Sequence, residues 1–259
     1  MTNDPFEAWV AHYQPKPRIR LRLFCFPYAG GGASIFRGWD AALPEAVEVC
    51  PIQLPGRENR FGEAPFTRMQ PLIETLAQVL APRLDIPFAL WGHSMGARIG
   101  FELARHLRSQ DAPQPAQVFV SGTPAPPFWN AAPPIHALPE ADFLGEMRRI
   151  NAALTDVLQN AELIRLVLPS LRADFELCET HRYRPDAPLS CPITAYGGAQ
   201  DTSPTVAQLL HWREQTCADF TSHILPGDHF FLHSAHRDLL RLLADELTQL
   251  LEQKETVSF

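Results

Sequence analysis

The stretch FALWGHSMGA, residues 88–97, decides the fold of this chain. An apolar run is followed by the pattern Gly-x-Ser-x-Gly, and a helical pattern then covers 95–109. A strand that turns sharply into a helix at such a serine is a nucleophile elbow, in which a strained turn holds the serine oxygen above the sheet. Glycines at 92 and 96 let neighbouring strands and the helix come close. We therefore expect Ser94 to be a nucleophile; the alternative is a serine with only a structural role in the turn.

Short apolar runs and longer helical patterns alternate on both sides of this stretch. The predicted strands cover 21–26, 47–53, 88–91, 117–121, 193–196 and 220–225, and the predicted helices cover 68–84, 95–109, 204–216 and 230–252. Alternation of this kind implies right-handed crossovers and a mostly parallel sheet with helices on both faces. With the elbow, it predicts the α/β-hydrolase fold.

One region departs from the alternation. About 70 residues with no convincing strand separate the strand ending near Ser121 from the one starting at Ile193. The region opens with six prolines between Thr123 and Pro139 and continues with helical patterns over 140–150 and 155–182. A simple crossover needs only about a dozen residues. We predict a single domain over 1–259 with a helical lid inserted at 123–190, because insertions over such sheets often act as lids.

A serine nucleophile needs a base and an acid that orients the base. In α/β-hydrolases the order along the chain is serine, then an acid, then histidine. The run ITAYGGAQD, 193–201, ends in Asp201, and FTSHILPGDH, 220–229, ends in His229. We predict Ser94, Asp201 and His229 as the catalytic residues. Asp228 is the alternative acid, but it adjoins the histidine in sequence and would struggle to reach behind its ring.

Two backbone N–H groups are needed to stabilise the oxyanion of a tetrahedral intermediate. Met95, directly after the serine, is the first predicted donor. The second is expected in the glycine-rich turn after an early strand, FPYAGGG, 26–32. We choose Ala29, with Tyr28 as the alternative. A phosphate-binding loop fits this turn less well, because the chain has no G-x-G-x-x-G and no P-loop lysine there.

Composition excludes several other classes of protein. The 259 residues carry 22 basic and 29 acidic side chains, a net charge of −7, which argues against nucleic acid as the main partner. No apolar run approaches the ~20 residues that span a bilayer, and no signal peptide is visible. We expect a cytoplasmic protein that does not bind membranes. His229, His233 and His236 have helical spacing, but no acidic or cysteine partner accompanies them, so we expect no metal.

Five motifs occur in order along the chain: FPYAGG (26–31), LPGR (54–57), GHSMG (92–96), LRADF (171–175) and GDHFF (227–231). Together, from about 20 to 240, they make the chain resemble the type II, stand-alone thioesterases of nonribosomal peptide and polyketide synthesis. The resemblance implies hydrolysis of acyl groups from the phosphopantetheine arm of carrier-protein domains. It also implies a helical lid carrying 171–175, the same three catalytic residues, no cofactor beyond the partner's phosphopantetheine, and a monomer.

The carrier partner raises a question of charge, because carrier domains are usually acidic and this chain is acidic too. Four arginines of the insertion are candidates for a basic docking patch: Arg148, Arg149, Arg165 and Arg172. A solvated helix face is an equal alternative. The main alternative function is a small-molecule esterase, lipase or peptidase on the same fold. A non-catalytic binding protein and transfer of the acyl group to an acceptor other than water are further alternatives.

Overall fold

A computed structural model describes residues 4–11, 13, 15–150 and 160–256. Its centre is a six-stranded sheet in the order β2-β1-β3-β4-β5-β6, with every neighbouring pair parallel. The strands are β1 (Leu21–Phe26), β2 (Val47–Pro51), β3 (Phe88–His93), β4 (Gln117–Ser121), β5 (Ile193–Gly198) and β6 (Phe220–Leu225).

The strand order changes direction between β1 and β3. The chain runs outward from β1 to β2 on one side, and continues through β3 and β4 on the other. Phe26 is in register with Gly92, so the carboxyl ends of β1 and β3 lie at the same level. Ligands of open α/β sheets bind in the crevice at such a switch point. The loops that follow β1 and β3 are the two that carry the predicted oxyanion donors.

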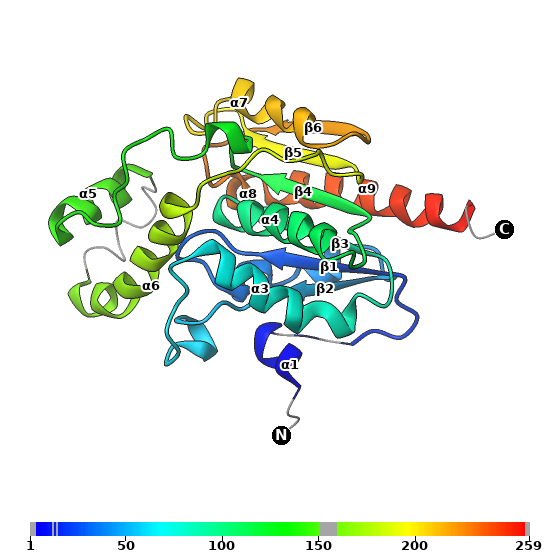
Figure 1. The fold of residues 1–259 in the computed structure, drawn as a ribbon, viewed down its shortest axis with the longest axis horizontal. Helices are drawn as coiled ribbons and strands as arrows, with labels where there is room; N and C mark the ends of the chain where they lie inside the picture. Colours follow the sequence, from blue (N-terminus) through cyan, green and yellow to red (C-terminus); the bar gives the residue numbers. More distant parts are fainter. Residues whose placement is uncertain (1–3, 12, 14, 151–159, 257–259) are drawn as a thin grey trace.

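Helices cover both faces of the sheet (Figure 1). Alternate residues of each strand feed two hydrophobic cores: Phe24 and Phe26 pack with α3 and α4, whereas Leu23 and Cys25 pack with α2 and α9. Strands buried on both faces are expected to be mostly apolar, as FALW is and as LRLFCF is apart from Arg22, which pairs with Glu48. The helices are α1 (Pro5–Trp9), α2 (Trp39–Ala42), α3 (Met69–Leu80), α4 (Met95–Ser109), α5 (Glu140–Ile150), α6 (Ala161–Thr180), α7 (Val206–Leu210), α8 (Phe231–Ser234) and α9 (His236–Thr256).

The helices α5 and α6 lie between β4 and β5 in the chain, and Figure 1 shows them beyond the ends toward which the strand arrows point. They share a small hydrophobic cluster of their own, with Phe143, Met147, Ile164 and Leu171 buried. These helices form the region predicted as an insertion at 123–190; its action as a lid stays a prediction. The helix expected over 155–182 is observed at Ala161–Thr180, and residues 155–159 lie outside the described residues.

Several element ends differ from the sequence expectation. The helix predicted over 68–84 ends at Leu80 and continues as a 3₁₀ turn, since Pro82 has no N–H to bond the preceding turn. The helix predicted over 204–216 is α7 followed by a 3₁₀ helix at His211–Gln215. Its start at Val206 is set by a capping box between Thr205 and Gln208. The helix predicted over 230–252 is divided into α8 and α9.

Within the described part of the chain, no helix is both long enough and apolar enough to span a bilayer.

Candidate active site

Ser94 occupies the turn between β3 and α4 with φ 54° and ψ −113°. Positive φ is uncommon for a residue with a side chain, and costs on the order of 1–3 kcal/mol unless the surroundings enforce it. Here a bond from the Ser94 N–H to the Ser121 carbonyl, 2.7 Å, ties the turn to the end of β4. The strained serine is the geometry expected of a nucleophile elbow.

The two glycines of the elbow are required by close approach. A Cβ on Gly92 would lie 2.2 Å from the backbone of Gly96, and one on Gly96 would lie 2.1 Å from the Phe26 carbonyl oxygen. Since real Cβ atoms do not come this close to backbone, neither position tolerates a side chain. The contact of Gly96 with Phe26 also brings the start of α4 against the end of β1, where the glycine-rich turn begins.

That turn, Tyr28–Gly31, closes through a bond from the Gly31 N–H to the Tyr28 carbonyl, 2.9 Å, and Gly30 has φ +81°. A four-residue turn with positive φ at its third residue follows the type II pattern. Among the described residues, neither the Tyr28 nor the Ala29 N–H has an acceptor. Met95 is the first residue of α4, and the first N–H groups of a helix lack an intrahelical acceptor. The structure therefore brings the segments carrying the predicted donors together; their roles stay proposals.

Asp201 and His229 lie side by side on the loops after β5 and β6. His229 Nδ1 is 2.9 Å from Asp201 Oδ2, and the Asp201 side chain is only 3% exposed. The other carboxylate oxygen, Oδ1, accepts the Ser203 N–H at 2.9 Å. Since an ionised carboxylate only accepts, His229 carries hydrogen on Nδ1, which leaves Nε2 free to exchange a proton. This is the orientation that a general base needs.

Asp228, the alternative acid, uses its carboxylate elsewhere. Its Oδ1 accepts the Phe230 N–H within its own loop, at 2.9 Å. Two hydrogen bonds join this loop to the loop of Asp201. The Gln200 N–H donates to the Gly227 carbonyl at 2.9 Å, and the Gly227 N–H donates to Gln200 Oε1 at 2.6 Å. These bonds hold the histidine and the aspartate at a fixed separation.

His93 places this pair beside the elbow. Its ring centroid lies 5.2 Å from that of His229, and it directly precedes Ser94 in the chain. His93 is fully buried, with Nδ1 2.8 Å from the Ser121 hydroxyl. Burial, with His229 as a smaller cause, holds the pKa of His93 well below its usual value. His93 therefore stays neutral next to His229.

This neutral histidine makes stability depend on pH. Below about pH 6.5 the unfolded chain binds a proton on His93 that the folded protein does not bind. The free energy of unfolding therefore decreases as the pH is lowered, by up to about 1.4 kcal/mol for each pH unit. In His93→Gln, this contribution is absent. We expect urea unfolding at pH 7.5, 6.5 and 5.5 to show that the free energy of unfolding decreases more steeply in the wild type than in His93→Gln as the pH is lowered. Equal slopes below pH 6.5 would contradict the burial argument.

The other histidines considered for a metal have separate partners. His233 Nε2 lies 3.0 Å from the Tyr28 hydroxyl, and His236 Nδ1 lies 3.3 Å from the Leu232 carbonyl. Within the described residues, no three His, Cys, Asp or Glu side chains are grouped as metal ligands. Of the four arginines proposed as a docking patch, Arg172 donates to the His136 carbonyl at 2.6 Å and stacks on Phe143, whereas Arg148, Arg149 and Arg165 are exposed.

Arg57 and Asp174 belong to the motifs LPGR and LRADF, and neither residue was among those predicted from sequence to form the site. The structure joins them in a buried ion pair that contacts the glycine-rich turn. In the sequence, Asp174 lies between Ala173 and Phe175 in a helical stretch, and Arg57 directly follows Leu-Pro-Gly. Neither stretch shows that the two side chains meet, because 117 positions separate them.

Comparison with known proteins shows the family of the chain. A family model described as "Thioesterase domain" matches residues 21–247. The chain is 45% identical over 246 residues to the gramicidin S biosynthesis protein GrsT of Aneurinibacillus migulanus, covering 95% of this chain and 96% of the relative.

Two solved structures are similar over nearly the whole chain. RedJ, a thioesterase from the prodiginine biosynthetic pathway of Streptomyces coelicolor, superposes with a TM-score of 0.84 at 39% identity, covering 90% of this chain and 93% of RedJ. YbtT, a type II thioesterase from the yersiniabactin NRPS/PKS biosynthetic pathway, has a TM-score of 0.79 at 29% identity, covering 92% of this chain and 97% of YbtT.

Proposed function

The chain belongs to the thioesterase domain family, and on that premise we propose that it is a type II thioesterase that hydrolyses acyl or aminoacyl thioesters on the phosphopantetheine arm of carrier-protein domains. The substrate class is supported by the names of three similar proteins, which refer to gramicidin S biosynthesis, to the prodiginine biosynthetic pathway and to the yersiniabactin NRPS/PKS biosynthetic pathway. The observation that carries the chemistry is the bond between His229 Nδ1 and Asp201 Oδ2, 2.9 Å, beside the strained Ser94. Release of such acyl groups would regenerate stalled synthases.

In the proposed acylation step, His229 Nε2 takes the proton of the Ser94 hydroxyl as its oxygen attacks the thioester carbonyl carbon. The N–H groups of Met95 and Ala29 donate to the oxyanion that forms. Collapse of the tetrahedral intermediate breaks the C–S bond, and the pantetheine sulfur leaves with the proton from His229. An acyl ester on Ser94 remains. Because a thiolate leaves readily, the demand on the general acid is lighter than for an amide.

In the proposed deacylation step, a water molecule gives its proton to His229 Nε2 and attacks the ester carbonyl. The second tetrahedral intermediate uses the same two N–H donors. Collapse returns the proton to the Ser94 oxygen and releases the carboxylic acid. Asp201 holds the imidazole in the required tautomer and stabilises the imidazolium of each step. No step needs a cofactor beyond the partner's phosphopantetheine, and we propose a cytoplasmic monomer.

A comparison of matched substrates tests the substrate class. The same acyl group is supplied as a thioester on a carrier domain, as a thioester on free pantetheine, and as a simple oxygen ester. We expect kcat/KM to be highest for the carrier thioester, because both the thiolate leaving group and the carrier surface contribute. A highest kcat/KM for the oxygen ester would contradict the proposal and favour a small-molecule esterase.

A further inference from the structure

Arg57 and Asp174 form a buried, two-pronged ion pair between the loop after β2 and the insertion helix α6. Arg57 Nη1 lies 2.7 Å from Asp174 Oδ2, and Nη2 lies 2.7 Å from Oδ1. The two side chains are 8% and 3% exposed. A guanidinium fork on a carboxylate fixes direction as well as distance. A buried pair is weak evidence for stability, since apolar residues often serve as well.

The same two side chains hold the glycine-rich turn. Asp174 Oδ2 accepts the Gly30 N–H at 2.7 Å, and Arg57 Nη1 donates to the Gly31 carbonyl at 3.2 Å. The Gly31 N–H donates to the Tyr28 carbonyl. The N–H groups of Gly30 and Gly31 and the carbonyl of Gly31 therefore all have hydrogen-bond partners. The N–H of Ala29, the predicted oxyanion donor, is left without an acceptor among the described residues.

Packing and further hydrogen bonds leave the turn little room to move. A Cβ on Gly30 would lie 2.9 Å from Leu171 Cδ1, so α6 presses directly on the turn. The far side of the loop is fixed by Gln53, whose Oε1 accepts the Ala33 N–H at 2.9 Å and whose Nε2 donates to the Arg57 carbonyl at 3.1 Å. Arg57 is thus held at its backbone while its side chain holds the turn.

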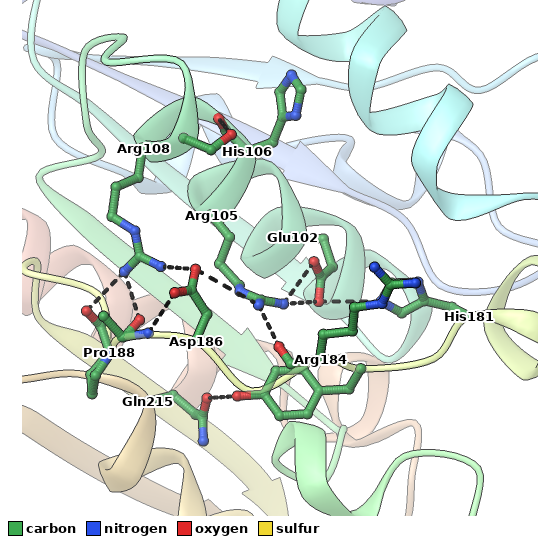
Figure 2. A network of polar contacts seen from close by, with 12 residues as sticks. Glu102, Arg105, His106, Arg108, His181, Arg184, Asp186, Pro188 and Gln215 are labelled. Atoms are coloured by element: carbon green, nitrogen blue, oxygen red, sulfur yellow. Dashed lines mark hydrogen bonds and ion pairs between the residues drawn. The ribbon is translucent and has the colours of Figure 1, made fainter.

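The insertion is anchored independently at its other end. Two arginines of α4 bind the segment that follows α6 (Figure 2). Arg105 donates to the Arg184 carbonyl at 2.6 Å, and Arg108 donates to the Asp186 carboxylate at 2.6 Å. Arg105 lies eleven residues after Ser94, about 16 Å along the helix at 1.5 Å per residue. This network fixes the insertion near residues 184–186, away from the turn, whereas Asp174 and Leu171 of α6 contact the turn itself.

We propose that Asp174 and Arg57 are positioning residues for thioester hydrolysis, which hold the turn so that the Ala29 N–H is directed at the oxyanion. Packing of α6 against the turn that follows β1 and completion of the oxyanion site are then one event. This inference rests on the proposed function, because it assumes the acyl transfer to Ser94. Neither residue touches the substrate; each acts through the backbone of the turn.

The test uses Asp174→Asn, which keeps the shape of the side chain and removes its charge, and Arg57→Lys, which keeps the charge and removes the fork. With a soluble acyl-pantetheine thioester, we expect Asp174→Asn to lower kcat on the order of 100-fold, as loss of one oxyanion donor does. KM stays close to the wild-type value, because the ground-state carbonyl does not need the donor. We expect Arg57→Lys to lower kcat less than Asp174→Asn does.

A second measurement separates positioning from folding. An acyl trifluoromethyl ketone forms a tetrahedral adduct with an active-site serine, so its Ki is expected to rise in step with the loss of kcat while KM does not change. The matched control is Glu48→Gln, which breaks the equally buried Arg22–Glu48 pair, 7% and 2% exposed, at the start of β1 and β2. We expect the control to lower Tm and leave kcat and Ki unchanged.

The outcomes distinguish this inference from the proposed function. Asp174→Asn with wild-type kcat and Ki, and a loss of Tm like that of Glu48→Gln, would overturn the positioning role and leave the proposed function standing. A wild-type protein with no activity on the thioester would overturn both.

Discussion

Replacing Ser94 by alanine is expected to lower kcat for thioester hydrolysis by about 10⁵-fold or more, the scale seen when the nucleophile of a catalytic triad is removed. The hydroxyl oxygen is the atom to which the acyl group is transferred, and a methyl group offers no substitute. KM should change little, because binding of the substrate does not depend on the new covalent bond. The measurement is steady-state release of free thiol from an acyl-pantetheine thioester.

Ser94→Gly serves as the companion variant that excludes a folding defect. Glycine adopts φ 54° without strain, whereas alanine and serine do not. We expect Ser94→Gly to be equally inactive but more stable than Ser94→Ala, by on the order of 1 kcal/mol in urea unfolding. Substantial turnover in either variant, with the protein folded, would contradict the assignment of Ser94.

Replacing Asp201 by asparagine is expected to lower kcat by about 10⁴-fold, because an amide at this place no longer selects the tautomer of His229 that accepts the serine proton. The fold should survive, since asparagine has the same shape and can still accept the Ser203 N–H. The measurement is kcat across the pH range in which the wild type is active. A loss that a rise in pH restores would show that only the basicity of the histidine had changed.

Asp228→Asn is the matched control for this variant. It makes the same chemical change one residue before His229, at a carboxylate that bonds the Phe230 N–H. We expect kcat close to the wild-type value. A large loss in Asp228→Asn together with a small loss in Asp201→Asn would reverse the assignment of the orienting acid.

The sheet was predictable from sequence mainly because five of its six strands, β1 to β5, are buried along their whole length, whereas β6 is partly exposed. The run FALW is apolar throughout and LRLFCF is apolar apart from Arg22, and two of the shortest predicted strands needed only extension, to His93 and Gly198. Helix ends were less predictable where a single capping side chain or a single proline determines them. The capping box that starts α7 and the proline that ends α3 decide boundaries that periodicity does not show.

The candidate site was predictable where strand ends gather its residues. Ser94, Asp201 and His229 each follow a strand of one parallel sheet, so their loops meet at the same edge. The partnership of Arg57 with Asp174 depends instead on how the insertion helix packs over the sheet. Such packing joins distant segments through side-chain shape, and no strand register or periodicity encodes it.

Acyl transfer from a carrier domain to Ser94 is tested most directly by a single-turnover experiment followed by intact-protein and peptide mass spectrometry. The protein is mixed with an acylated carrier domain and quenched at short times. We expect the carrier to lose the acyl mass and keep its phosphopantetheine, while the protein transiently gains the acyl mass on the peptide containing Ser94. A carrier that keeps its acyl group, or one that loses it just as fast with Ser94→Ala, would rule out hydrolysis through an acyl-Ser94 intermediate.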